Sequence, residues 1–255
     1  MSDNWNFYMD VLDDYLASIV IDLDVTEEVN IKKYKWLFSV KITIQHPTEI
    51  GNPGEQEDEK IGEWEYDLME KLNDEDIIQV GRLTTNGTRE FFYYAKKEKH
   101  GSIIDKHALA IFDKNGYETE ITVIEEEEPW SFYAEFLYPD EYQFQQMSNR
   151  ELIELLENEN DDLEEPRKVE HWIEFETLDN LKAFKQEIQK EGFIIESYEK
   201  ERNEEDTYSI TISRVDGVDY HIIDGVTDTI MSVAQEHNGI YDGWESPVVL
   251  KKNIL

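Results

Sequence analysis

The sequence contains no cysteine, so disulfide bonds and thiolate metal sites are excluded. Basic residues are scarce: 24 Lys and Arg stand against 60 Asp and Glu, which gives a net charge of −36. Proteins bind nucleic acids largely by neutralising phosphates with Lys and Arg. The charge balance therefore disfavours direct nucleic-acid binding. It indicates either a partner protein with a basic surface or a solvated acidic surface that keeps the protein soluble.

Long apolar runs are also missing from the chain. No stretch approaches the roughly 20 apolar residues needed to span a bilayer, and Met1 is followed by Ser-Asp-Asn-Trp rather than by a basic and then an apolar segment. We therefore expect no membrane span, no signal peptide and a cytoplasmic location. Aromatic residues make up 12% of the chain, which is enough to build hydrophobic cores and excludes disorder throughout.

The sharpest change of composition lies at residues 157–168, which contain one aliphatic side chain and include Pro166, a residue that cannot continue a helix. We expect a domain boundary at about 160–167, with one domain over residues 1–160 and the other over 167–255. Eight acidic residues lie from Glu151 to Glu165, and we expect them to be exposed. The segment lacks the Gly that a calcium-binding EF-hand loop requires, so no metal site is predicted there.

The second half has a clear periodicity. Apolar and polar residues alternate in 169–177, which predicts a strand, and apolar residues then recur every three or four positions up to Gly192, which predicts a helix. Two further strands are expected at 193–201 and 207–215, a helix at 220–237 and a last strand at 240–250. This βαββαβ order predicts a ferredoxin-like unit, in which a four-stranded antiparallel sheet carries both helices on one face.

The first half repeats this order after an initial strand at 15–25. The expected elements are a strand at 34–46, a loop at 49–58, a helix at 59–72, two strands at 76–85 and 88–97, a helix at 101–114 and a strand at 117–126. Asn86-Gly87 is a strong hairpin signal between the two middle strands. The predicted fold class is α+β with two ferredoxin-like units, of which the N-terminal unit has one extra leading strand.

Three motifs in the second half resemble the regulator of ribonuclease activity B (RraB) family. They are Glu-His-Trp-Ile-Glu-Phe-Glu-Thr at 170–177, Ser-Arg-Val-Asp-Gly-Val-Asp at 213–219, and the most specific one, Ala-Gln-Glu-His-Asn-Gly-Ile-Tyr-Asp-Gly-Trp-Glu at 234–245. The first half resembles the uncharacterised domain often fused in front of that family. This second resemblance rests on residues 4–8, 80–94, 129–133 and 137–139.

The family's members bind and inhibit ribonuclease E. The resemblance therefore implies a non-enzymatic protein that binds and restrains a ribonuclease E-like partner, without a cofactor. The residues expected to bind the partner lie in the family motifs and are Trp172, Arg214, Asp216, Tyr241, Asp242, Trp244 and Glu245. For residues 241–245 a structural role is the alternative, with Gly243 forming a bulge and Trp244 covering the core.

Catalytic chemistry has little support in the sequence. His237, Asp242 and Trp244 form one conceivable acid–base group, but a His at a helix C-terminus also favours the helix dipole without any catalysis. Neither a Gly-x-Ser-x-Gly elbow nor a phosphate-binding Gly-x-x-x-x-Gly-Lys loop is present. We expect no catalytic residue and no metal.

Two other functions stay open. A small-ligand binder or hydrolase that uses a cleft between the domains is one alternative. RNA binding through aromatic residues on the sheets is another, because RNA-recognition modules share the βαββαβ order. The acidic run Glu125–Glu128 either contacts a basic partner or is a solvated strand end.

Overall fold

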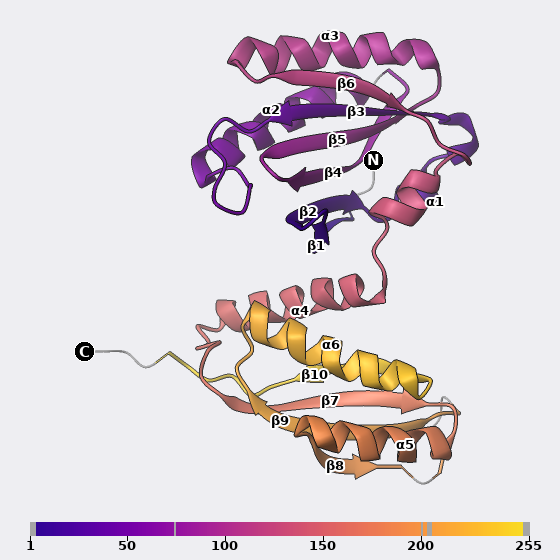
Figure 1. The fold of residues 1–255 in the computed structure, drawn as a ribbon, viewed down its shortest axis with the longest axis vertical. Helices are drawn as coiled ribbons and strands as arrows, with labels where there is room; N and C mark the ends of the chain where they lie inside the picture. The colour runs from indigo at the N-terminus through magenta and orange to yellow at the C-terminus, as the bar shows by residue number, and fades with distance from the viewer. Residues whose placement is uncertain (1–3, 74, 200, 203–205, 252–255) are drawn as a thin grey trace. The chain divides into compact units, whose positions relative to one another are not determined.

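The computed structural model describes residues 4–73, 75–199, 201–202 and 206–251. The chain forms two compact units, Met1–Asp140 and Glu141–Leu255 (Figure 1). Each unit is a mixture of helices and an antiparallel sheet, which confirms the α+β class. In the described residues, no helix has both the length and the apolar character needed to cross a membrane.

The N-terminal unit has a six-stranded sheet in the order β1-β2-β4-β5-β3-β6. Its strands are β1 Trp5–Leu12, β2 Tyr15–Asp22, β3 Trp36–Thr43, β4 Ile77–Thr85, β5 Thr88–Ala95 and β6 Thr119–Ile124; its helices are α1 Val25–Glu28, α2 Glu55–Asn73 and α3 Gly101–Ile111. From β3 to β6 the order is βαββαβ, as expected. The leading strand pairs with a further strand, β1, which the sequence analysis had not identified, so two strands precede this order instead of one.

Helices α2 and α3 cover one face of this sheet. Phe91, Tyr93 and Ala95 of β5 point into the core beneath them, together with Ile61 and Ile104 from the helices. Helix α2 begins at Glu55, inside the segment predicted to be a loop, because the Glu57 carboxylate accepts hydrogen bonds from the amides of Gln45 and His46 and so ties the first helical turn to the sheet.

The opposite face of the N-terminal sheet is covered by residues 129–138, which contain a short π-helix, Tyr133–Leu137. Trp130 stacks on Tyr94 with ring centroids 4.0 Å apart. The Trp130 indole N–H donates to Tyr34 O at 2.8 Å, and the Tyr133 hydroxyl donates to Asp22 O at 2.8 Å. The motif residues at 129–133 therefore have a structural role, which is to close the second face of the sheet.

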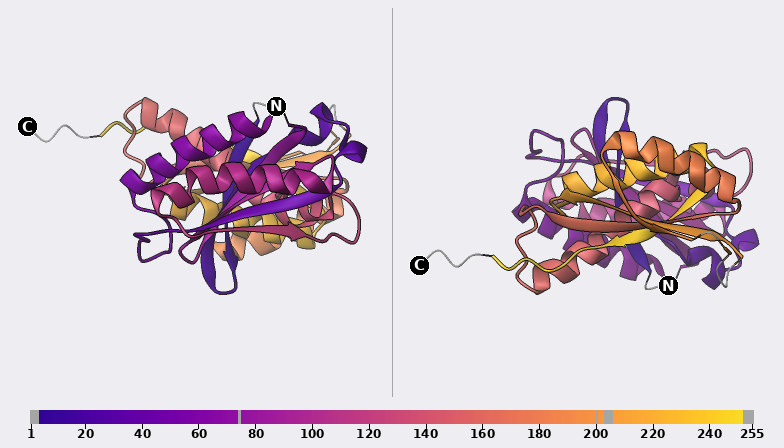
Figure 2. Two further views of the ribbon diagram at one scale, coloured as in Figure 1. Left: turned by 90° about the horizontal axis from the view of Figure 1, so that it is seen from above. Right: turned by 90° about the horizontal axis from the view of Figure 1, so that it is seen from below.

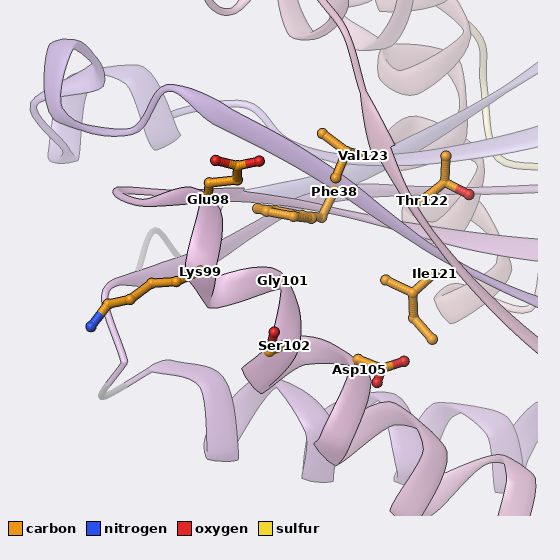
Figure 3. Close-up of a pocket in the computed structure, with 9 residues that line it drawn as sticks. All are labelled: Phe38, Glu98, Lys99, Gly101, Ser102, Asp105, Ile121, Thr122 and Val123. Atoms are coloured by element: carbon orange, nitrogen blue, oxygen red, sulfur yellow. The ribbon is translucent and has the colours of Figure 1, made fainter.

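Helix α3 starts very close to β3. A Cβ atom at Gly101 would lie 2.5 Å from the Phe38 ring, so glycine is required at this approach. Beside this contact, a shallow hollow of about 520 Å³ lies between the first turn of α3 and strand β6 (Figure 3).

The C-terminal unit has the sheet order β10-β7-β9-β8, which is the ferredoxin-like arrangement. Its elements are α4 Glu141–Asn158, β7 Arg167–Phe175, α5 Leu178–Ile188, β8 Ile194–Tyr198, β9 Tyr208–Asp216, α6 Tyr220–Glu236 and β10 Gly239–Glu245. Thr177 and Asp219 cap α5 and α6 through their side chains, as their residue types favour. Figure 2 shows the same elements from two further directions.

Helix α4 explains why the compact units divide at 140/141, whereas the sequence analysis placed the boundary at about 160–167. The helix packs against α6, and its residues Ile153 and Leu156 belong to the C-terminal core (Figure 1). The sequence analysis assigned the residues of this helix to the first domain, because the polar segment that follows them has the composition of a linker.

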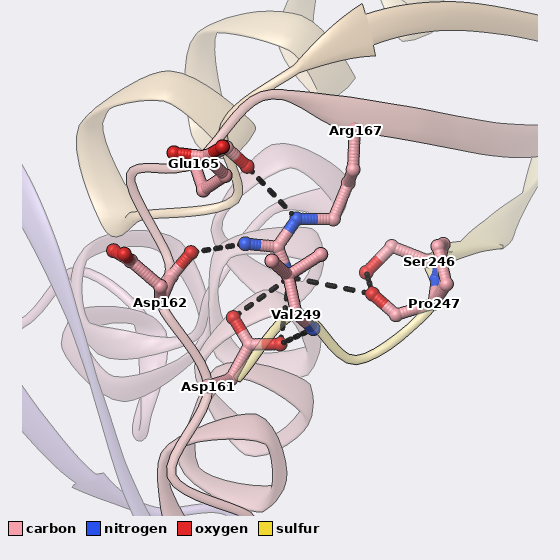
Figure 4. Close-up of polar contacts among 7 residues, drawn as sticks. All are labelled: Asp161, Asp162, Glu165, Arg167, Ser246, Pro247 and Val249. Atoms are coloured by element: carbon pink, nitrogen blue, oxygen red, sulfur yellow. Dashed lines mark hydrogen bonds and ion pairs between the residues drawn. The ribbon is translucent and has the colours of Figure 1, made fainter. Parts of the chain in front are cut away.

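The polar segment at 157–168 is held in place by a buried ion pair between Asp161 and Arg167 (Figure 4). Both side chains are almost fully buried, and the Arg167 Nη1 atom lies 2.6 Å from Asp161 Oδ2. The Val249 amide donates to the same carboxylate at 2.7 Å, which fixes the segment after β10. Asp161 therefore departs from the expectation that the acids of Glu151–Glu165 are exposed.

Candidate protein-binding surface

The C-terminal sheet has one face that helices α5 and α6 do not cover. Alternate β7 residues Val169, His171, Ile173 and Phe175 point to the helices and are buried, so the residues between them point to the other side. We call this other side the open face. Strand register assigns to it Lys168, Glu170, Trp172, Glu174, Ile194, Ser197, Ser209, Thr211, Ser213, Val215, Ile240, Gly243 and Glu245.

Trp172 is the aromatic residue at the middle of the open face. Its register partners are Thr211 on β9 and Gly243 on β10, both of which are small. Gly243 has φ +143°, and a Cβ atom placed there would meet nothing within 4 Å. The half-buried indole therefore stands beside open space, which a partner's side chain can fill.

Carboxylates surround this indole. Glu170, Glu174 and Glu245 lie on the open face, and the Glu196 carboxylate reaches it by accepting a hydrogen bond from the Ser213 hydroxyl at 2.7 Å. This hydrogen bond, together with Lys168 at 2.9 Å, holds the pKa of Glu196 below its usual value. Lys168 also pairs with Glu170, and it is the single cation among the open-face residues defined above. The face is consequently negative.

Three aliphatic side chains on the open face are strongly exposed: Ile194 on β8, Val215 on β9 and Ile240 on β10 are between 63% and 73% exposed. They lie toward the margins of the sheet, whereas Trp172 lies on a central strand. An aromatic residue at the centre with polar residues around it is an arrangement that protein interfaces favour at their core and rim.

The predicted partner-binding residues divide between the two faces. Trp172 and Glu245 lie on the open face, and Asp242 is exposed at the bulge of β10 between Tyr241 and Gly243. Tyr241 and Trp244 point to the helix side instead. The bulge produces this division, because one extra residue shifts the alternation of the strand.

Trp244 has the role of a core residue. It is 8% exposed, and its indole N–H donates to Asn149 Oδ1 on α4 at 2.8 Å. Asn149 in turn donates to Asp224 and Thr227 on α6, so one buried amide joins α4, α6 and β10. This burial favours the structural alternative for Trp244.

Tyr241 makes a buried contact with His171, whose Nδ1 atom lies 2.8 Å from the Tyr241 hydroxyl. Burial, and to a smaller extent the charge of Arg214, lowers the pKa of His171 to about 3. Burial also raises the pKa of Tyr241 well above its usual value. The imidazole is therefore neutral at physiological pH. The sequence analysis did not single out this pair, because its two residues are 70 positions apart.

Arg214 and Asp216 form an ion pair at the end of β9, with Arg214 Nε 2.9 Å from Asp216 Oδ2. The Arg214 guanidinium also lies over the Phe193 ring and donates to Glu191 O. These contacts hold the turn after α5 against β9, which is a local structural role.

The predicted acid–base group is not brought together. His237 Nε2 lies 3.1 Å from Glu187 Oε2, at the adjoining ends of α5 and α6, and not beside Asp242. Glu187, Glu236 and His237 each offer one ligand atom within 4.8 Å of the others. These atoms are capable of ligating a metal ion. However, two of the three side chains, His237 and Glu187, are already paired with each other.

Comparison with known protein families assigns a family model to each half of the chain. The family of unknown function DUF695 matches residues 3–138, which is more than half of the chain. The chain belongs to the DUF695 family. Beyond this DUF695 domain, the regulator of ribonuclease activity B family matches residues 146–246, which include β7 to β10 and the whole open face. Both resemblances seen in the sequence are thereby confirmed. No curated protein matches the chain.

Two solved structures give weaker likenesses to the DUF695 chain. A candidate glycine cleavage system transcriptional repressor is 6% identical over 84% of this chain and 98% of its own, with a TM-score of 0.26. An unknown protein from Galdieria sulphuraria is 11% identical over 84% of this chain and 99% of its own, with a TM-score of 0.24.

Proposed function

We propose that this protein is a non-enzymatic regulator of a ribonuclease, which it binds through the open face of its C-terminal sheet. The observation that carries the proposal is the position of Trp172, which stands among carboxylates on an uncovered sheet face within the segment that matches the ribonuclease-regulator family. Large aromatic side chains in such positions are the residues that most often dominate binding energy.

The proposed partner is a basic surface of a ribonuclease E-like enzyme. Ribonucleases bind RNA through Lys and Arg, and a protein with a net charge of −36 is attracted to such a surface. A guanidinium or ammonium group placed over Trp172 would gain a cation–π contact and would be paired by Glu170 or Glu174. Occupation of the basic surface would then compete with RNA.

The test is to measure binding to a purified ribonuclease E-like endonuclease and cleavage of its RNA substrate. We expect the intact chain to bind and to slow cleavage. The substitution Trp172→Ala should speed dissociation by about tenfold or more, because it removes the central anchor. Trp36→Ala removes an exposed tryptophan from the other unit and is the matched control. Absence of binding, or equal effects of the two substitutions, would contradict the proposal.

A further inference from the structure

Strand β6 lies at one edge of the N-terminal sheet, and in the described residues no further strand pairs with its outer side. Edge strands are usually blunted by bulges, prolines or inward-pointing charges, because their unpaired backbone groups attract other strands. The edge strands of the C-terminal sheet, β8 and β10, both contain a register shift. In contrast, β6 pairs with β3 in unbroken register from Thr119 to Ile124, and five of its six residues are Thr, Val or Ile, with no proline.

The hollow between β6 and α3 adjoins this edge (Figure 3). Its strand side consists of Ile121, Thr122 and Val123, and Val123 is 45% exposed although it is the register partner of buried Phe38. Its helix side is the N-terminal part of α3, where Ser102 and Asp105 are exposed. An extended chain added to β6 would therefore place alternate side chains over the apolar patch of Phe38, Ile121 and Val123.

The charges around β6 select a basic occupant. Glu98 and Asp105 line the hollow, whereas Lys99 extends away from it in Figure 3. Beyond the end of β6, Glu125, Glu127 and Glu128 are exposed. Glu126 is used internally, since its carboxylate accepts hydrogen bonds from the Tyr94 hydroxyl and the Phe132 amide. A second copy of this chain would bring the same carboxylates against themselves, so self-pairing is disfavoured.

We propose that β6 and the first turn of α3 form a strand-addition site for an extended, lysine- or arginine-containing segment of a partner protein. Main-chain hydrogen bonds to β6 supply affinity, and the hollow selects an aliphatic side chain at alternate positions. The acidic residues after β6 pair with the basic residues of the segment. This site lies in the DUF695 unit and is separate from the open face, so it provides a second binding function.

The probe for this test is a fluorescent peptide of three lysines followed by three Thr-Val pairs. Its binding to the full chain is followed by anisotropy, together with hydrogen exchange of residues 119–124. We expect saturable binding and slower exchange in β6. The same peptide with N-methylated backbone amides should not bind, because it lacks the donors for a new strand pair.

Two substitutions separate the site from general attraction to an acidic protein. Ser102→Trp fills the hollow from an exposed helix position and should weaken binding about tenfold, as should Glu to Gln at 125, 127 and 128. Glu to Gln at 55, 59 and 63, which are exposed on α2, is the charge-matched control and should have little effect. Equal binding of the N-methylated peptide, unchanged affinity in Ser102→Trp, or dimerisation that protects β6 without peptide would overturn the proposal.

Discussion

At the scale of single residues, Trp172 and Trp244 have different roles although they lie on paired strands, β7 and β10. Their strands are neighbours, and Trp244 is the register partner of His171, next to Trp172. Yet Trp244 is held by Asn149 inside the core, whereas Trp172 is on the open face. Substitution of Trp244 would therefore weaken folding of the unit before it revealed anything about binding.

His171 gives a prediction about pH at this scale. Its pKa of about 3 lies below the ordinary value of 6.5, because burial disfavours the charged imidazole. The neutral imidazole contributes its full stabilisation above about pH 6.5. This stabilisation is lost as the pH falls towards 3, because in that range His171 is protonated in the unfolded chain but not in the folded one. We expect a loss of about 2 kcal/mol in the free energy of unfolding near pH 5, measured with urea.

The control for this prediction is a second histidine. His171→Gln should flatten the dependence of stability on pH between about 5 and 7, whereas His221→Gln, at an exposed position of α6, should leave it unchanged. An identical pH dependence in His171→Gln and the unaltered protein would show that other groups produce it.

At the scale of elements, the segment between α4 and β7 is held by tertiary contacts rather than by its own conformation. Arg167 donates to the carbonyl oxygens of Asp162 and Glu165 as well as pairing with Asp161 (Figure 4). The Val218 amide donates to Leu163 O at 2.8 Å, which adds the turn before α6. One buried guanidinium thus replaces the hydrogen bonds that a regular element would have supplied.

Asp161→Asn should lower the free energy of unfolding of the C-terminal unit by about 3 kcal/mol, because it leaves the charge of Arg167 buried without a counterion. Chemical denaturation followed by circular dichroism would measure this. Asp162→Asn is the matched control, since Arg167 contacts the backbone oxygen of Asp162, and it should change stability by less than about 0.5 kcal/mol. Similar losses in the two variants would refute the assigned role of the ion pair.

At the scale of the whole molecule, the net charge of −36 dominates encounters with other molecules. Its field extends over a Debye length of roughly 8 Å at physiological salt and farther in dilute buffer. Attraction to a basic partner therefore acts mainly on the rate of association, whereas short-range packing around Trp172 sets the rate of dissociation.

We expect the association rate with a basic ribonuclease to fall by about tenfold between low and physiological salt, with a smaller change in dissociation. Glu to Gln at 151, 154, 157 and 159, all of which are exposed, should slow association at low salt if this acidic segment steers the encounter, and should leave folding nearly unchanged. Stopped-flow or surface-based kinetics would measure both rates. An association rate that does not change with salt would contradict the prediction that electrostatic attraction speeds the encounter.

Much of this molecule could be predicted from sequence, since apolar periodicity and Gly or Asn at element ends define most helices and strands. Strand β1 was missed although Asn6 and Asp10 alternate with apolar residues in it, and its place at the edge of the sheet depends on pairing with β2. The open face was not predicted as a unit either. The side of Trp172 follows from the plain alternation of β7, but the side of Trp244 depends on the bulge in β10, and a bulge changes the side of every residue after it.

The bulge in β10 also bears on how this strand tolerates changes in length. Tyr241 and Trp244 share the core side although three positions separate them, because Asp242 is extra to the pairing. Deletion of Asp242 would restore plain alternation and keep Trp244 inside. Deletion of both Asp242 and Gly243 would instead turn Trp244 outward. Relatives whose chains differ here by one residue can therefore retain the fold, whereas a difference of two residues would invert this edge of the sheet.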